Sequence, residues 1–139
     1  MISAELMQYL DDQIDDITYD ETGTSGNIFD NTLPSSPDLA VKVENSGGFP
    51  RDMWSTAYFA PTFRLLVRGG ADPREPKELA QEIIDVIGDL SNIHFVPGGA
   101  RIIKCQAMQD NPISTGRDDE GRHRFSTNFE MRVLNYEAM

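Results

Sequence analysis

The chain has 139 residues, a net charge of −11 at pH 7 and a pI of about 4.4. This length suits one domain with its own core, which we expect to span residues 1–139. The acidic balance excludes binding to nucleic acid through phosphate neutralisation unless a local basic patch exists. The single cysteine, Cys105, excludes an intrachain disulfide and a cysteine-rich zinc site.

No stretch of the sequence approaches the roughly 20 apolar residues that a membrane span requires. Residues 1–16 lack the basic start and the apolar run of a signal peptide. We therefore expect a protein that is made and kept in a cytoplasm and has no membrane partner.

Residues 4–17 predict a first amphipathic helix. Its apolar stripe has helical spacing and consists of Leu6, Leu10, Ile14 and Ile17. The other face carries four carboxylates, which form like-charge pairs at i,i+4 spacing: Asp11, Asp12, Asp15 and Asp16. This acidic face is either a solvated surface kept for solubility or a surface that meets a basic partner or repels DNA, and the pattern does not choose between them.

Three strands are predicted before the second helix. Residues 27–30 give a short one, and residues 39–44 and 63–68 alternate apolar and polar side chains. The segment 45–61 between the last two is predicted as a long loop, a type of segment that is usually functional or mobile. It contains Arg51 and Trp54, which we take as candidates for contact with a partner.

A second amphipathic helix is predicted over residues 73–90, because Asp72 is a good N-cap and Pro73 suits the first helical position. A short strand at 94–96 and a strand at 101–108 follow. In the latter, alternation places Ile103, Cys105 and Ala107 on one face.

Residues 111–121 read as a polar loop, and residues 124–134 as the clearest strand of the chain. The strand alternates five core-type side chains with polar ones: Phe125, Thr127, Phe129, Met131 and Val133. Strands with one apolar face are typical of antiparallel sheets. The sequence therefore predicts an α+β fold, a mostly antiparallel sheet with two amphipathic helices packed on one face.

No catalytic, metal-binding or cofactor-binding set emerges. His94 and His123 are far apart in sequence and each stands alone, and Cys105 lies on an apolar strand face without a neighbouring base. The segment 69–72 joins a strand to a helix but lacks the Gly-Lys-Ser/Thr ending of a phosphate loop. The carboxylates of 118–120 lack the spacing of a calcium loop. We expect a protein that is not an enzyme and needs no cofactor.

From Leu90 onward the sequence resembles the tail terminator proteins of long-tailed bacteriophages, also catalogued as tail-completion or minor capsid proteins. The motifs that carry the likeness are the strand IIKCQAM at 102–108, the loop NPISTGRDDEGR at 111–122 and the strand STNFEMRV at 126–133. The Pro-x-x-x-Gly-x-Asp loop that leads into an Asn-Phe strand is the most similar part. As motif the likeness covers about a third of the chain, and as an order of elements it covers most of it.

The resemblance implies a structural virion protein rather than an enzyme. Members of the family cap the growing tail tube, end its polymerisation and form the joint to the head connector, as a hexameric ring around the DNA channel. The implied partners are further copies of this chain, the tail tube protein and the head-connector or stopper protein, while DNA passes through without specific binding. The implied location is the head–tail junction of the virion, after assembly in the host cytoplasm.

The loops 45–61 and 111–121 are then the candidates for contact with the tube and the connector. Within the second loop the candidate residues are Asn111, Pro112, Arg117, Asp118, Asp119 and Glu120. Two other functions stay open. One is an acidic binding module, such as a DNA mimic or an inhibitor of a basic host protein. The other is a small enzyme using Asp118 with Glu120, which a polar loop disfavours because it would leave both carboxylates solvated.

Overall fold

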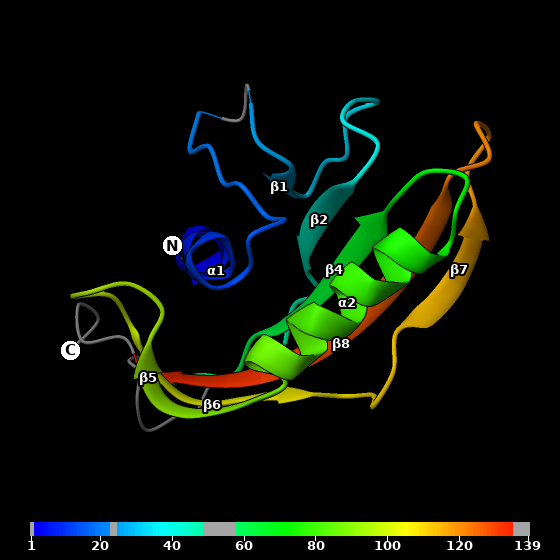
Figure 1. Ribbon diagram of the computed structural model, residues 1–139. Coiled ribbons are helices and arrows are strands. Elements are labelled where there is room, and N and C mark those ends of the chain that lie inside the picture. Colours follow the sequence, from blue (N-terminus) through cyan, green and yellow to red (C-terminus); the bar gives the residue numbers. More distant parts are fainter. Residues whose placement is uncertain (1, 23–24, 49–57, 135–139) are drawn as a thin grey trace.

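The computed structural model describes residues 2–22, 25–48 and 58–134, shown in Figure 1. It has two helices, α1 (Ile2–Gln13) and α2 (Arg74–Ile87). The strands are β1 (Ile28–Asp30), β2 (Ala40–Asn45), β3 (Tyr58–Phe59), β4 (Thr62–Arg68), β5 (Asp89–His94), β6 (Arg101–Ala107), β7 (Ile113–Arg117) and β8 (His123–Leu134).

All eight strands form one sheet in the order β1-β2-β4-β8-β6-β5, with β3 and β7 also paired to β8. The pair β1–β2 is parallel, and the other described pairs are antiparallel. The prediction of an α+β fold with a mostly antiparallel sheet is thus confirmed.

Strand β8 is the centre of this sheet. Along its 12 residues it pairs with β4 on one edge and with β6 and then β7 on the other. The five side chains predicted to share its apolar face are all buried: Phe125, Thr127, Phe129, Met131 and Val133. Because side chains alternate along a strand, the residues between them point to the opposite surface of the sheet.

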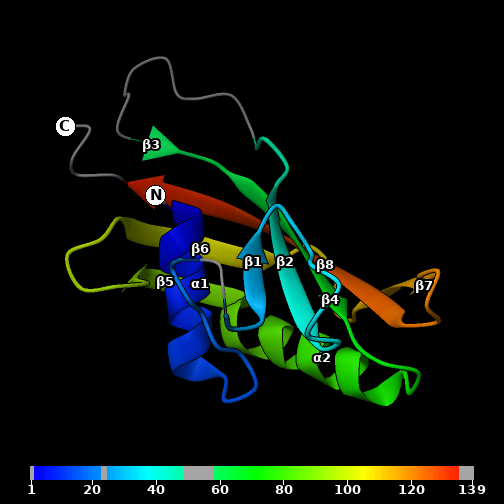
Figure 2. The same cartoon turned by 90° about the horizontal axis from the view of Figure 1, so that it is seen from above.

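Both helices contribute to the hydrophobic core. Leu6 and Leu10 of α1 and Leu79, Ile83 and Ile87 of α2 belong to one buried cluster with the apolar residues of the strands. Helix α1 contacts β1 and β2, whereas α2 contacts β4, β8, β6 and β5. Figure 2 shows the two helices running in different directions, with α2 lying along the sheet.

The first helix ends earlier than predicted, at Gln13 rather than residue 17. Asp15 and Asp16 lie in a turn beyond it, so the expected i,i+4 pairs of carboxylates do not form on a helix. The last helical turn has no basic residue, and the negative end of a helix disfavours further carboxylates there. Ile14 and Ile17 are nevertheless buried, since the turn returns both to the core.

The second helix also ends early, at Ile87, and β5 starts at Asp89 instead of residue 94. The Gly88 amide donates to the Ile84 carbonyl at 2.7 Å and closes the helix. The Gly88 carbonyl accepts from the Ala107 amide at 2.8 Å, which brings the chain directly into pairing with β6. Leu90, predicted as helical, therefore lies in a strand opposite Cys105.

Strand β6 does not alternate as predicted. Its register against β8 shifts between Ile102 and Lys104, which is the signature of a bulge. Ile102 is consequently fully buried and Ile103 only half-buried, although the simple alternation put Ile103 on the face of Cys105. The core residues of β6 are therefore Ile102 and Cys105, three positions apart.

The segment predicted as a polar loop at 111–121 is largely a hairpin arm. Residues Ile113–Arg117 form β7, which pairs with the start of β8. All five of its residues are exposed, so no apolar alternation signals the strand in the sequence. Its formation follows from the length of β8, which extends beyond β6 and offers an open edge.

Substitution at the bulge distinguishes the two isoleucines. We expect Ile102→Ala to lower the free energy of unfolding by about 2–5 kcal/mol, since it leaves a cavity in the core. Ile103→Ala, which removes the same atoms at a half-buried position, should cost less than half as much. Urea denaturation of both variants measures the difference, and equal losses would contradict the register of β6 described above.

Candidate interaction surfaces

The tip of the β7–β8 hairpin is held by one aspartate. Asp118 Oδ1 accepts from the amide of Glu120 at 3.0 Å and from that of Arg122 at 2.9 Å. The Gly121 amide donates to the Asp118 carbonyl at 3.0 Å, with Gly121 at a φ of 77°, which glycine adopts without strain. The loop from Asp118 to Gly121 is thus an ordered turn.

The Arg122 side chain connects this hairpin to the segment before β2. Its Nε donates to Asp118 Oδ2 at 2.8 Å, and its Nη2 lies 3.2 Å from Glu120 Oε2. Its Nη1 donates to the Ser35 carbonyl at 2.7 Å and lies 3.4 Å from Asp38 Oδ1. The guanidinium is buried, so these contacts replace the water that it loses.

A second buried arginine, Arg68 of β4, also binds the segment before β2. Arg68, 3% exposed, donates through Nε to the Asp38 carbonyl at 3.1 Å and through Nη2 to the Pro37 carbonyl. Burial and the neighbouring positive charge of Arg122 lower the pKa of Arg68. The segment 35–38, the end of β4 and the hairpin tip therefore form one ionic cluster.

This cluster gives the carboxylates of the hairpin a structural role. Hydrogen bonds from Arg122 to Asp118, from its amide first and then from its side chain, lower the pKa of Asp118. A general acid requires the opposite shift, and Glu120 shares the same guanidinium. The arrangement does not favour the hypothesis of an enzyme that uses Asp118 with Glu120.

The four aspartates of the N-terminal region form what we call the N-terminal acidic surface: Asp11, Asp12, Asp15 and Asp16. Three of them are exposed, while the half-buried Asp11 accepts from the Tyr19 amide at 2.9 Å and so fixes the chain after the helix. Helix α1 is itself anchored at its other end, because Glu5 Oε1 accepts from the Ala100 amide at 3.0 Å. The acidic surface is therefore held on a fixed support.

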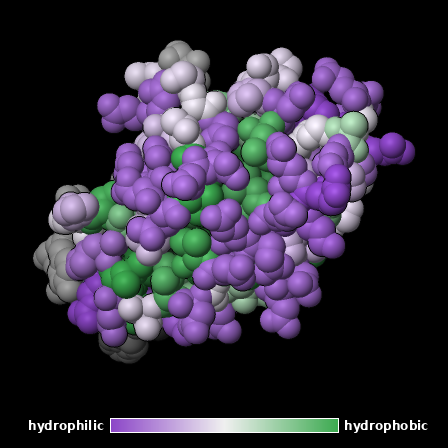
Figure 3. All heavy atoms as spheres, in the orientation of Figure 1, coloured by the Kyte–Doolittle hydropathy of each residue, from purple (hydrophilic) through white to green (hydrophobic). Residues whose placement is uncertain are grey.

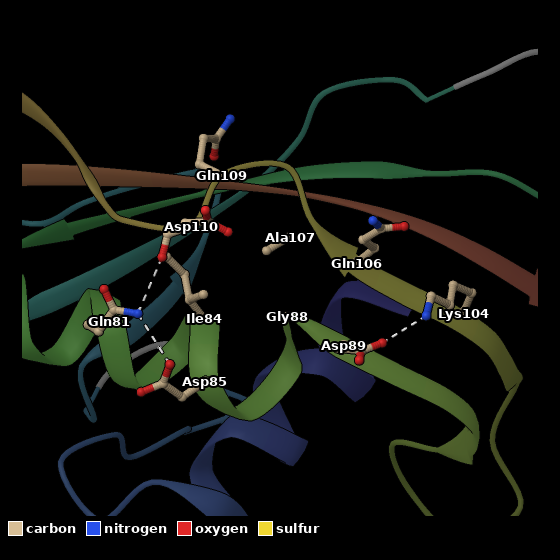
Figure 4. Close-up of a pocket in the computed structure, with 10 residues that line it drawn as sticks. All are labelled: Gln81, Ile84, Asp85, Gly88, Asp89, Lys104, Gln106, Ala107, Gln109 and Asp110. Atoms are coloured by element: carbon tan, nitrogen blue, oxygen red, sulfur yellow. Dashed lines mark hydrogen bonds and ion pairs between the residues drawn. The ribbon is translucent and has the colours of Figure 1, made fainter.

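An open, polar groove of about 570 Å³ lies between α2 and the strand pair β5–β6. Figure 4 shows Gln81 reaching Asp85 and the carbonyl of Asp110 at one end, and Lys104 paired with Asp89 at 2.7 Å at the other. Its carboxylates face water or these partners, and neither histidine nor Cys105 lines it. The groove holds no arrangement of nucleophile and base.

The histidines and the cysteine are not brought together. His94 Nδ1 lies 3.0 Å from the Gly99 carbonyl, whereas His123 begins β8. Burial raises the pKa of Cys105 to about 12, so its thiol is protonated at neutral pH. Within the described ranges no three His, Cys, Asp or Glu side chains group as they would around a metal ion. No helix of the described residues is long and apolar enough to cross a membrane.

Comparison with known proteins decides the family. The model of the family described as bacteriophage tail terminator protein matches residues 3–135. The chain belongs to the bacteriophage tail terminator family. It is therefore a structural component of a phage tail and of the virion. The family resemblance seen in the sequence is confirmed.

The fold has a solved counterpart. A chain from the virion of a native gene transfer agent (GTA) particle superposes with a TM-score of 0.58 at 15% sequence identity, over 96% of this chain and 98% of that one. At this identity the likeness shows a shared fold. None of the curated proteins compared matches the chain.

The tail terminator fold brings most of the predicted contact residues to the β7–β8 hairpin. Asn111 and Pro112 precede β7, Arg117 ends it, and Asp118, Asp119 and Glu120 form its tip, with Asp119 and Glu120 exposed. Arg51 and Trp54 lie outside the described residues. The contribution of these residues to an interface stays a prediction.

Sequence reasoning missed Arg122 and Arg68, the residues that organise the hairpin. The alternation over residues 63–68 predicts Arg68 only as the polar end of a strand. For Arg122, the available signal was its position four residues after Asp118, next to a glycine. Its contacts with Ser35 and Asp38 join positions 87 and 84 residues apart, respectively, which no local pattern reveals.

Removing the guanidinium should loosen the hairpin. In Arg122→Gln we expect a lower midpoint of urea denaturation and faster hydrogen exchange at the amides of Asp118 and Gly121, because Asp118 loses its charged partner. Arg117→Gln, with the same charge loss on an exposed side chain, should leave both unchanged. Unaltered exchange in Arg122→Gln would contradict the role assigned to the cluster.

The depressed pKa of Asp118 predicts a pH dependence. A carboxyl whose pKa is lower when folded adds stability above its unfolded value, near 3.9, and loses this contribution as pH falls through the folded value. Asp118→Asn should therefore show a smaller loss of stability than the wild type between pH 5 and pH 2, measured by thermal denaturation. Asp119→Asn should behave as the wild type, and a wild-type acid response in Asp118→Asn would contradict the prediction.

Proposed function

We propose that this protein caps the tail tube, ends its polymerisation and forms the joint to the head connector, as a hexameric ring around the DNA channel. The observation that carries the proposal is the family match over residues 3–135. It favours this function over an acidic module that inhibits a basic host protein. The ring stoichiometry, the capping step and assembly in the host cytoplasm are parts of the proposal.

The architecture supports a role in assembly. Helices α1 and α2 both add side chains to one core, and we propose that they cover one face of the sheet, so that its other face is free for contact with a partner. The hairpin of β7 and β8 projects from the body of the sheet, as Figure 1 shows, and its tip is held rigid by Arg122. Such a projection suits contact with the tube protein or the connector protein.

The residues proposed for these contacts are those of the hairpin and of the 45–61 segment. The hairpin contributes Asn111, Pro112, Arg117, Asp118, Asp119 and Glu120, and the segment contributes Arg51 and Trp54. Asp118 and Glu120 are already engaged with Arg122, which leaves Asp119 and Arg117 as the charged side chains most available to a partner. DNA passing through the ring meets an acidic protein and is not bound specifically.

Deletion of the gene tests the function directly. Without the protein, tails should grow to uncontrolled length and fail to join heads, because nothing stops addition of tube subunits or presents the connector surface. Electron microscopy of lysates measures both. Restoration by the wild-type gene in trans is the control. Tails of normal length joined to heads in the deletion strain would end the proposal.

A further inference from the structure

The charges of this chain are separated in space. No lysine or arginine precedes Lys42, whereas the same stretch carries the N-terminal acidic surface and five further carboxylates. Figure 3 shows that hydrophilic side chains cover much of the face seen from the direction of Figure 1. The pairing register of the strands shows on which face of the sheet the lysines and arginines lie.

Most of them point away from the core. In β2, β4 and β8 every second residue faces the core, for example Val41, Val43, Phe63, Leu65 and Val67. The residues between them point to the opposite side, and we call the surface that they form the outward sheet face. Through its pairing with Arg132, Lys104 of β6 joins this face. By this register its cations are Lys42, Arg64, Arg68, Arg101, Lys104, Arg124 and Arg132, of which Arg68 is buried beneath residues 37–38 and is not available to a partner. The carboxylates among them are fewer, namely Glu44, Asp89 and Glu130.

Two cation pairs on this face lie directly opposite each other across strands. Arg68 pairs with Arg124 between β4 and β8, and Lys104 pairs with Arg132 between β6 and β8. Like charges in this position destabilise a sheet. Part of this cost is offset within the chain, for example by Asp89 on Lys104, by the carbonyls of residues 37–38 on Arg68 and by the Arg117 carbonyl, which accepts from Arg124.

Two donors on the same face also lack a hydrogen bond. The Nε atoms of Arg64 and Arg124 are the buried side-chain nitrogens without such a partner in the described ranges, and Arg64 Nε lies 3.6 Å from Glu44. Each of these two Nε atoms is covered by the chain itself, so a partner would reach the arginines through their exposed atoms; the side chain of Arg64 is 42% exposed. Carboxylates of a partner would offset the repulsion within the two cation pairs.

We propose that the outward sheet face of one copy binds the N-terminal acidic surface of a second copy of this chain. The inference rests on the proposed ring, and it names the two surfaces that join neighbouring subunits. Asp15 and Asp16, exposed on the turn after α1, would approach the cations of β8 in the next subunit.

The location of the two surfaces supports a head-to-tail contact. Helix α1 packs its apolar side chains into the core, and the outward sheet face points away from that core. Two different surfaces on different sides of one molecule make a heterologous contact, which closes into a ring when the rotation between subunits permits it. A contact of either surface with itself would bring like charges together.

DNA is the other polyanion that a basic face could bind, and the face suits it less well. Glu44 lies 2.6 Å from Lys42 and also faces Arg64, while Glu130 lies in the middle of β8. Interleaved carboxylates repel a continuous phosphate backbone but accommodate discrete side chains. The net charge of −11 opposes approach to DNA as well.

Paired charge reversals test the contact. Variant A is Asp15→Lys with Asp16→Lys, at two exposed positions. Variant B is Arg124→Glu with Arg132→Glu, and each new glutamate faces a cation across the sheet, Arg68 or Lys104, which protects the fold. The matched control is Glu78→Lys with Glu82→Lys on the exposed side of α2, which has the same charge change as variant A.

Sedimentation equilibrium at low salt and high protein concentration measures self-association. The wild type and the control should associate, and added salt should reverse the association since exposed charges are screened. A and B alone should each associate at least about tenfold more weakly. An equimolar mixture of A and B should recover association. The lysines introduced in A can bind the glutamates introduced in B, and the unchanged aspartates of B can bind the unchanged cations of A, so the two variants alternate.

Recovery in the mixture is a result that misfolding cannot produce. A monomeric wild type at low salt, unchanged association in A and B, or no recovery in their mixture would each overturn the proposal. Retained wild-type association that is lost on adding short duplex DNA would also overturn it, in favour of a nucleic-acid surface. None of these results alters tail length in the gene deletion, so failure of the contact and failure of the proposed function are distinguishable.

Discussion

The structure depends on the alternation of side chains along β8. One set of its residues fills the core with Phe125, Phe129 and Met131, and the set between them carries Arg124, Glu130 and Arg132 to the opposite surface. Because β4, β6 and β7 all take their register from this strand, a slip by one residue would exchange the two sets. The burial of large side chains on one face therefore fixes the charges on the other.

The helices and strands whose apolar residues recur at regular spacing could be predicted from the sequence. Strands β4 and β8 and the apolar stripe of α2 follow from alternation or helical spacing within one short window. The ends of elements and the bulge could not be predicted, because they depend on contacts with segments that are distant in sequence. The end of α2 is tied to Ala107, the bulge of β6 is visible only against β8, and β7 exists because β8 is longer than β6.

The candidate interaction surfaces were also predictable in part: their residue types could be read from local sequence, but their distant contacts could not. Composition and likeness to a family single out residues 111–121, but they predict a loop where the structure has a hairpin. Its order comes from Arg122, whose contacts with Ser35 and Asp38 lie far away in sequence. The N-terminal aspartates were found as charges on a helix, whereas Asp15 and Asp16 lie beyond its end. Residue types were predictable, and their partners were not.

Charge then connects the fold to assembly. A chain whose first 41 residues contain no lysine or arginine, and whose outward sheet face carries several of them, has complementary surfaces in every copy. A tail terminator that must assemble only with its own kind and with a few tail proteins benefits from this arrangement, since complementary charge contributes to specificity and speed of association more than to affinity. The buried arginines of the hairpin cluster, by contrast, are neutralised within the chain.

Electron cryomicroscopy of intact virions containing this protein is the most direct test. At the end of the tail tube it should show a ring in which the outward face of β8 in each subunit contacts residues 11–16 of its neighbour. A ring in which that face of β8 is open to solvent or lines the DNA channel would contradict the central claim that the two faces of β8 separate the core from the contact between subunits.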